Sequence, residues 1–126
     1  MADELAALAA HIDAARCRWL ELLAEFDRRG EWGDWIGATS CADWLSWRCA
    51  VGTGEAREFV RVAGWLRELP LLHAAFARGE LSYSKLRLVS KVADAESEEK
   101  LLDLASRVST GQLQRLLRSY ARVTKD

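Results

Sequence analysis

Four basic residues near the end of the chain have the spacing of a single helical stripe: Arg115, Arg118, Arg122 and Lys125. Their 3-4-3 spacing follows the turn of an α-helix, and no acidic residue lies between Arg107 and Lys125. Such a stripe can bind nucleic-acid phosphates, with an affinity that falls steeply as salt rises. A solvated face, or a helix that continues into further sequence, would show the same spacing.

Two further groups of polar and basic residues have helical spacing: Ser84, Arg87 and Lys91, and Arg57 with Arg61. The first group has the short polar and basic side chains of a recognition helix, although any amphipathic surface helix shows the same pattern. The second group fits phosphate contacts or solvated partners of Glu58 and neighbouring acids. We take all nine residues as the candidate nucleic-acid-binding set.

Cysteine and histidine, the usual metal ligands and nucleophiles, are few and scattered. The three cysteines, Cys17, Cys41 and Cys49, have no CxxC spacing, and the two histidines, His11 and His73, lie far apart in the sequence. We therefore expect reduced, mostly packed thiols, no metal site and a structural His73.

Sequence signatures of common enzymes are missing from the chain. It contains no Gly-rich phosphate loop, no HExxH and no GxSxG. Its carboxylates fall at predicted helix starts and on exposed faces, where they stabilise helices. The prediction is a non-catalytic domain with no cofactor and no small-molecule substrate.

The elements that position these residues are predicted to be helical throughout. The 126 residues include only one proline, and Ala, Leu, Arg and Glu are abundant. We expect an all-α fold in which residues 1–126 form one compact domain of about six to seven helices. No apolar run approaches the roughly 20 residues of a membrane span, and no basic leader starts the chain, so we expect a cytoplasmic protein.

The first predicted helix, residues 2–29, is the longest and carries a heptad seam. It ends at Gly30, the expected left-handed cap. The seam has 3-4 spacing over three heptads: Leu5, Leu8, Ile12, Ala15, Trp19, Leu22 and Phe26. Leu20 and Leu23 widen this seam toward its C-terminal half. The seam can pack along its own domain, which we rank first, or against a second copy of the helix.

Further helices are predicted from start and stop signals. Their ranges are 39–50, 55–69, 70–78, 83–93, a segment after Asp94, and a last helix after Ser109 with Leu113, Leu116, Leu117 and Tyr120 facing inward. Ser40 with Asp43 and Ser109 with Gln112 resemble capping boxes, and Thr53 is the expected cap of the third helix.

Two connecting segments bear on function. The link at residues 51–54 gives the second and third helices a helix-turn-helix-like pattern, which any helical hairpin also satisfies. The loop at residues 31–39 carries Trp32 and Trp35, which we expect to pack on the core. The alternative for these two rings is a stacking platform for a base.

Short motifs follow one another along nearly the whole chain: FDRRGEW at 26–32, Gly37, Ser40, Trp44-Leu45, Arg48, Glu55-Ala56, Arg61-Val62-Ala63, Leu66, Leu69-Pro70, Ala74-Ala75, Gly79-Glu80-Leu81-Ser82 and the helix from Lys85 to Val92. In this order they resemble the actinobacterial 13E12 repeat family, whose N-terminal part is the domain of unknown function 222 (DUF222). Members typically carry this helical region ahead of an HNH endonuclease domain and are often linked to mobile elements. The resemblance implies an accessory domain for DNA engagement. No HNH motif occurs in this sequence, so no catalytic residue can be carried over.

Two functions are therefore expected from the sequence. The first is a DNA-binding accessory domain that uses the basic stripes, with DNA as its partner. The alternative is a protein-interaction or dimerisation module built on the heptad seam of the first helix, with a homodimer as its product. Neither expectation involves a membrane.

Overall fold

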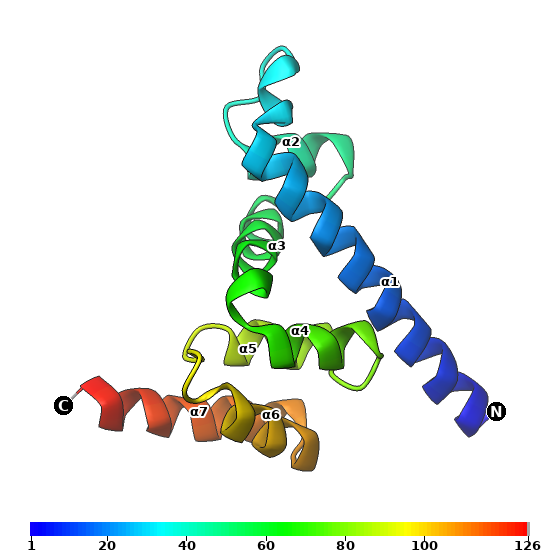
Figure 1. The fold of residues 1–126 in the computed structure, drawn as a ribbon. Helices are drawn as coiled ribbons and strands as arrows, with labels where there is room; N and C mark the ends of the chain where they lie inside the picture. The colour runs from blue at the N-terminus through cyan, green and yellow to red at the C-terminus, as the bar shows by residue number, and fades with distance from the viewer. Residues whose placement is uncertain (126) are drawn as a thin grey trace.

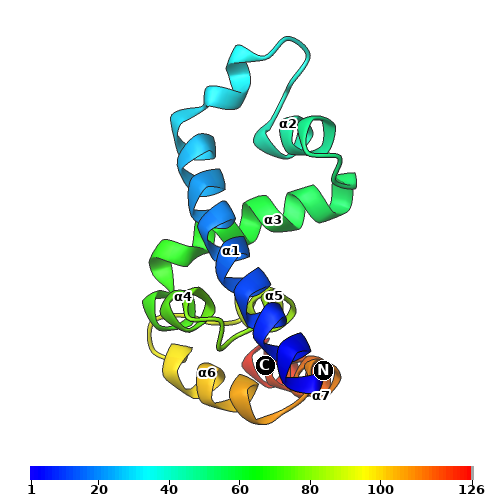
Figure 2. The ribbon, with the colours of Figure 1, turned by 90° about the vertical axis from the view of Figure 1, so that its right-hand side faces the viewer.

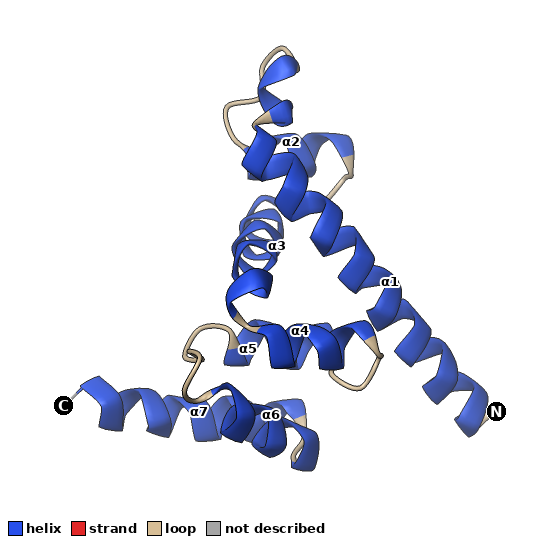
Figure 3. Ribbon diagram, in the orientation of Figure 1, coloured by secondary structure: helices blue, strands red, loops and turns tan. Residues whose placement is uncertain are grey.

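The computed structural model describes the backbone of residues 1–125 and the side chains of residues 1–120. All regular structure in that range is helical, so the predicted all-α class is confirmed (Figure 3). The elements are α1 (Ala2–Arg29), η1 (Glu31–Asp34), α2 (Cys41–Arg48), α3 (Thr53–Trp65), η2 (Leu66–Glu68), α4 (Pro70–Ala77), α5 (Tyr83–Val89), α6 (Glu98–Arg107) and α7 (Thr110–Lys125). None of these helices is long and apolar enough to cross a membrane.

Helix α1 is the long axis of the fold. Two basic residues occupy its last turn, and it stops at Gly30, which has φ 68° and donates its backbone N–H to the Asp27 carbonyl at 3.0 Å. Helices α3 and α4 both pack against α1, and in Figure 1 the three helices form the sides of a triangle. The first turns of α1 extend beyond the turn between α4 and α5 (Figure 1).

The heptad seam of α1 is not the face that packs into the domain. The buried residues of α1 are Cys17, Leu20 and Leu23, whereas Leu5, Leu8, Ile12 and Leu22 are all more than half exposed. Only Trp19 and Phe26 of the seam pack against the core. The preferred prediction of intramolecular packing is therefore wrong for Leu5, Leu8, Ile12 and Leu22 of the seam, whereas Leu20 and Leu23, which are predicted to widen it, are buried. The physical reason is that α3 and α4 cover a different stripe of the second half of α1 and leave residues 1–9 exposed.

Helices α2 and α3 form the hairpin that the glycine-containing link predicts, and they pack on each other. Ser40 caps α2 by accepting from the backbone N–H of Asp43 at 3.0 Å. Thr53 is not the cap of α3, because Gly52 holds that position and Thr53 is already helical. Trp65 ends the α-helix, and the predicted continuation to residue 69 tightens into η2.

The tryptophan loop packs only in part. Trp32 is half-buried against the core, as predicted. Trp35 is 43% exposed, because it rests against Trp44 and Trp47 at ring-centroid distances of 6.2 and 6.1 Å rather than inside the domain.

Helix α4 begins with Pro70 at its first turn and is followed by Gly79, which has φ 76°. Ser82 caps α5 by accepting from the N–H of Lys85 at 3.3 Å. The α-helix ends at Val89 and not at residue 93, because the chain tightens into turns after Ser90. Lys91 therefore lies in a turn beyond α5.

Helices α6 and α7 form a hairpin that packs under α4 and α5 (Figure 2). The predicted capping box at its turn is present, since Ser109 and Gln112 exchange hydrogen bonds of 2.9 and 3.2 Å. Leu113 and Leu117 are buried as predicted, whereas Leu116 is 44% and Tyr120 39% exposed. Among its described residues, the buried stripe of α7 is narrower than predicted, and α5 and α6 provide its main packing partners.

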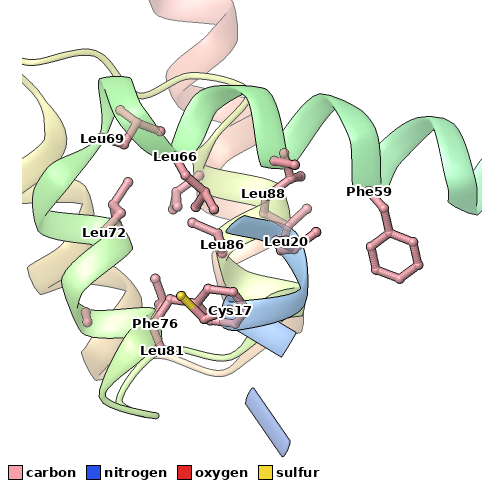
Figure 4. Packing of buried hydrophobic residues seen from close by; sticks show 14 of the residues in the cluster. Cys17, Leu20, Phe59, Leu66, Leu69, Leu72, Phe76, Leu81, Leu86 and Leu88 are labelled. Atoms are coloured by element: carbon pink, nitrogen blue, oxygen red, sulfur yellow. The ribbon is translucent and has the colours of Figure 1, made fainter. Parts of the chain in front are cut away.

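The hydrophobic core lies where α1, α3, α4 and α5 meet. Figure 4 shows Leu20 of α1 beside Leu86 and Leu88 of α5, with Phe76 of α4 and Leu81 next to Cys17. Because these residues are nearly inaccessible, the helices that carry the basic residues have fixed positions relative to one another.

Candidate nucleic-acid interface

Three of the predicted basic residues converge on one carboxylate. The Glu58 carboxylate of α3 lies 3.0 Å from Nε of Arg61, 3.5 Å from Nη1 of Arg87 and 4.0 Å from Nζ of Lys91. We call these four residues the Glu58 cluster. It joins the two groups that the sequence presents separately, and it leaves a surplus of positive charge.

Local structure fixes the cluster from both sides. Helix α3 buries Phe59 and Val62 in the core, which turns Glu58 and Arg61 toward α5. Arg61 also donates from Nη2 to the backbone carbonyl of Arg87 at 3.1 Å, so the guanidinium group bridges the two helices.

The electrostatics of the cluster favour its charged state. The hydrogen bond from Arg61 lowers the pKa of Glu58, and the charge of Lys91 and the hydrogen bond from Arg87 act in the same direction. Burial raises the pKa of neighbouring Tyr83 to about 12, and the Glu58 carboxylate adds to that shift. Arg16 of α1 stacks nearby over Trp19 and Phe59, 4.8 Å from each ring centroid.

The other predicted residues are more dispersed. Arg57 and Ser84 are exposed on α3 and α5, outside the Glu58 cluster. Arg115 and Arg118 are exposed on α7, which packs against α5, and Arg115 lines a shallow groove with Gln112 and Leu116. The side chains of Arg122 and Lys125 lie outside the described residues.

Lys85 has a structural role that the sequence around it does not reveal. Its Nζ donates to the backbone carbonyls of Ala105 and Val108, both at 2.6 Å, and so satisfies the C-terminal end of α6. The basic residues of α5 and of the turn that follows it therefore divide into one that holds α6, Lys85, and two that face Glu58, Arg87 and Lys91.

A second cluster was missed by the sequence analysis. The donor atoms of Cys17 and Glu21, one turn apart on α1, and of His73 on α4 all lie within 4.8 Å of one another. His73 Nε2 is 3.3 Å from Glu21 Oε2. Burial, and then the charge of Glu21, raise the pKa of the Cys17 thiol to about 11. The i, i+4 spacing of Cys17 and Glu21 was the only available signal, because His73 comes from a distant segment.

Comparison with family models finds a match to "Domain of unknown function (DUF222)" over residues 1–126. The chain belongs to the DUF222 family. Comparison with curated proteins and with solved structures finds no match. The DUF222 part of the resemblance carried by the short motifs is therefore confirmed, and the match covers the helical domain described above.

Proposed function

We propose that this DUF222 domain binds the phosphates of DNA and serves as a non-catalytic helical part of an HNH-endonuclease-type protein. The observation that carries the proposal is the Glu58 cluster. Three cationic side chains from α3 and the α5 region lie within 4.0 Å of one carboxylate. One of their charges is compensated there, and the other two remain available to an anion.

The type of contact within the cluster suits exchange with a phosphate. Arginine presents a planar donor fork that matches a phosphate as well as a carboxylate. The side chains of Arg87 and Lys91 are 35% and 49% exposed, and partly exposed ion pairs of this kind contribute little to stability. A backbone phosphate can therefore replace the Glu58 carboxylate as their partner at small cost.

Helix α7 extends the basic surface. Arg115 and Arg118 are exposed on a helix that packs against α5, so the two basic groups are carried by neighbouring helices. Several phosphate contacts of this kind add up to an affinity that does not depend on base sequence.

A salt titration with double-stranded DNA tests the proposal. At about 50 mM salt, where phosphate contacts are strongest, we expect binding by fluorescence anisotropy and a linear fall of log K with log salt. Arg61→Ala/Arg87→Ala and Arg115→Ala/Arg118→Ala should each weaken binding about tenfold or more. Each double variant should also reduce the slope by about 0.9 for every phosphate that the protein no longer neutralises.

Arg78→Ala is the matched control. Arg78 is an exposed arginine beside Glu80 at the end of α4 and belongs to neither basic group. Arg78→Ala should leave the slope of log K against log salt unchanged. An absence of binding at low salt, or an equal loss in the Arg78 variant, would contradict the proposal.

Glu58→Gln separates phosphate binding from a purely structural cluster. Removing the competing carboxylate should strengthen DNA binding severalfold at low salt, since the neighbouring cations then have no other anion. If the cluster is only structural, Glu58→Gln should not increase DNA affinity. It should instead weaken the packing of α3 against α5, and thermal unfolding of the same variant would show this as a lower unfolding temperature.

A second candidate function, self-association, rests on the exposed seam of α1. Leu5, Leu8 and Ile12 are 65%, 51% and 64% exposed on a helix whose buried stripe lies elsewhere. An apolar a/d seam of this kind gains free energy by packing against another helix.

Charge favours a second copy in antiparallel orientation. With Leu5 at heptad position a, Glu4 and Arg18 fall at g positions, which face each other in an antiparallel pair. In a parallel pair the g positions would instead face the e positions of the partner helix, which places His11 opposite Arg16. That arrangement brings no opposite charges together. A twofold contact would form Glu4–Arg18 twice.

Light scattering over a concentration series tests self-association. Ile12→Asp should weaken it about tenfold or more without loss of helix content, because Ile12 is not part of the core. Leu71→Asp, at an exposed leucine of α4, is the control. Glu4→Lys should weaken association, and adding Arg18→Glu should restore it. A wild-type protein that stays monomeric would exclude this function.

A further inference from the structure

We propose that Cys17, Glu21 and His73 form a binding site for a zinc ion at the junction of α1 and α4. The three donor atoms lie within 4.8 Å of one another and come from two helices that pack together. The site is separate from the Glu58 cluster and from the α1 seam, and neither proposed function uses it.

The distances fit a tetrahedral ion after a small adjustment. Two nitrogen or oxygen ligands at about 2.0–2.1 Å from zinc are roughly 3.3 Å apart at the tetrahedral angle. His73 Nε2 and Glu21 Oε2 already have that separation, 3.3 Å. A zinc–sulfur bond of about 2.3 Å requires the Cys17 sulfur to approach the other two donors by roughly 1.2 Å at most, which a side-chain rotation supplies.

The donor types select among metals. One thiolate, one imidazole and one carboxylate match the borderline character of zinc, whereas calcium and magnesium take oxygen ligands. On binding, zinc replaces the proton of the Cys17 thiol, and that proton passes to water. Three protein ligands leave the fourth position for a water molecule.

The exposure of the three side chains also suits a bound ion. Cys17 is buried, while the side chains of Glu21 and His73 are 38% and 28% exposed. Both line a cavity of about 350 Å³ between α1 and the region of α3 and α4. The ion can therefore enter from solvent, and the fourth ligand has room.

A Glu21–His73 ion pair without a metal is the competing explanation of the geometry. It accounts for the 3.3 Å contact but not for a thiol within reach of both groups. A metal site should bind one equivalent of a tetrahedral metal ion through all three side chains, whereas a simple ion pair should not.

Cobalt(II) substitution in the full chain under reducing conditions is the test. We expect the visible bands of a tetrahedral cobalt ion and a thiolate-to-cobalt charge-transfer band at one equivalent, with displacement by zinc. Cys17→Ser, Glu21→Gln and His73→Gln should each weaken metal binding on the order of 100-fold. Zinc should raise the unfolding temperature of the wild type and not of these variants.

Cys49→Ser and His11→Gln are the matched controls, since they remove an exposed thiol and an exposed histidine outside the cluster. Both should bind as the wild type does. The proposal is overturned by octahedral cobalt spectra, or by a loss of binding in the controls. Should Cys17→Ser fail to fold, the half-exposed Glu21 and His73 variants decide the question.

Discussion

Lys85 connects two parts of the chain through a single side chain. Its ammonium group donates to the carbonyls of Ala105 and Val108 at the end of α6, 20 and 23 residues further along the chain. Hydrogen bonds from a charged donor contribute more than neutral ones, and a carbonyl left without a partner carries a desolvation cost. This residue holds the α6–α7 hairpin to α5.

Lys85→Met keeps the length of the side chain and removes both hydrogen bonds. We expect it to lower the free energy of unfolding by about 2–3 kcal/mol. Urea denaturation measures the change. Lys100→Met, at an exposed lysine of α6, should change it by less than about 0.5 kcal/mol. Equal effects of the two substitutions would rule out a structural role for Lys85.

At the scale of elements, α1 is held against the α4–α5 turn by close backbone contact. A Cβ placed on Gly79 would lie 2.8 Å from the carbonyl oxygen of Ala10. In the same region the backbone N–H of Tyr83 donates to Asp13 of α1 at 3.2 Å, so α1 also supports the start of α5. Glycine at position 79 thus permits both the left-handed turn and the approach of α1.

Gly79→Ala tests this packing. The left-handed conformation alone costs roughly 1–2 kcal/mol for alanine, and the clash with Ala10 adds to it. Gly30→Ala is the control, because Gly30 has a similar φ of 68° with nothing within 4 Å of its Cβ position. We expect the Gly79 variant to lose more stability, by at least about 1 kcal/mol, in thermal or urea unfolding. Similar losses would show that α1 is free to shift.

At the scale of the whole molecule, burial of protonated groups makes stability depend on alkaline pH. Burial raises the pKa of the Cys41 thiol to about 12, with Asp27 adding to the shift, and raises that of Tyr83 to about 12. In the unfolded chain these groups ionise at about 8.5 and 10. Above roughly pH 9 the unfolded state has therefore lost protons that the folded state retains.

The free energy of unfolding should accordingly be unaffected by these groups below about pH 8 and should fall as pH rises toward 12. Urea titrations between about pH 7.5 and 10.5 measure the slope. Cys41→Ala should make the slope shallower, whatever it does to the absolute stability, while Cys49→Ala at an exposed thiol should not. An unchanged slope for Cys41→Ala would show that this thiol ionises equally in both states.

Local signals in the sequence determined much of this protein: the helical class, the stop at Gly30, the cap at Ser40, the start at Pro70 and the box of Ser109 with Gln112. Each of these signals acts within about four residues, so the neighbouring sequence contains all of the interaction. The short motifs likewise indicated the family.

Tertiary packing decided the rest. Leu5, Leu8 and Ile12 form a regular seam, yet the buried face of α1 is a different one, because the faces of α3 and α4 select which stripe they cover. The meeting of Glu58 with Arg87, and of Cys17 with His73, requires helices distant in the sequence to lie side by side. Helical periodicity determines which residues share one face of a helix, but it does not determine which helix faces pack together. The Glu58 cluster and the group of Cys17, Glu21 and His73 both depend on how the helix faces pack.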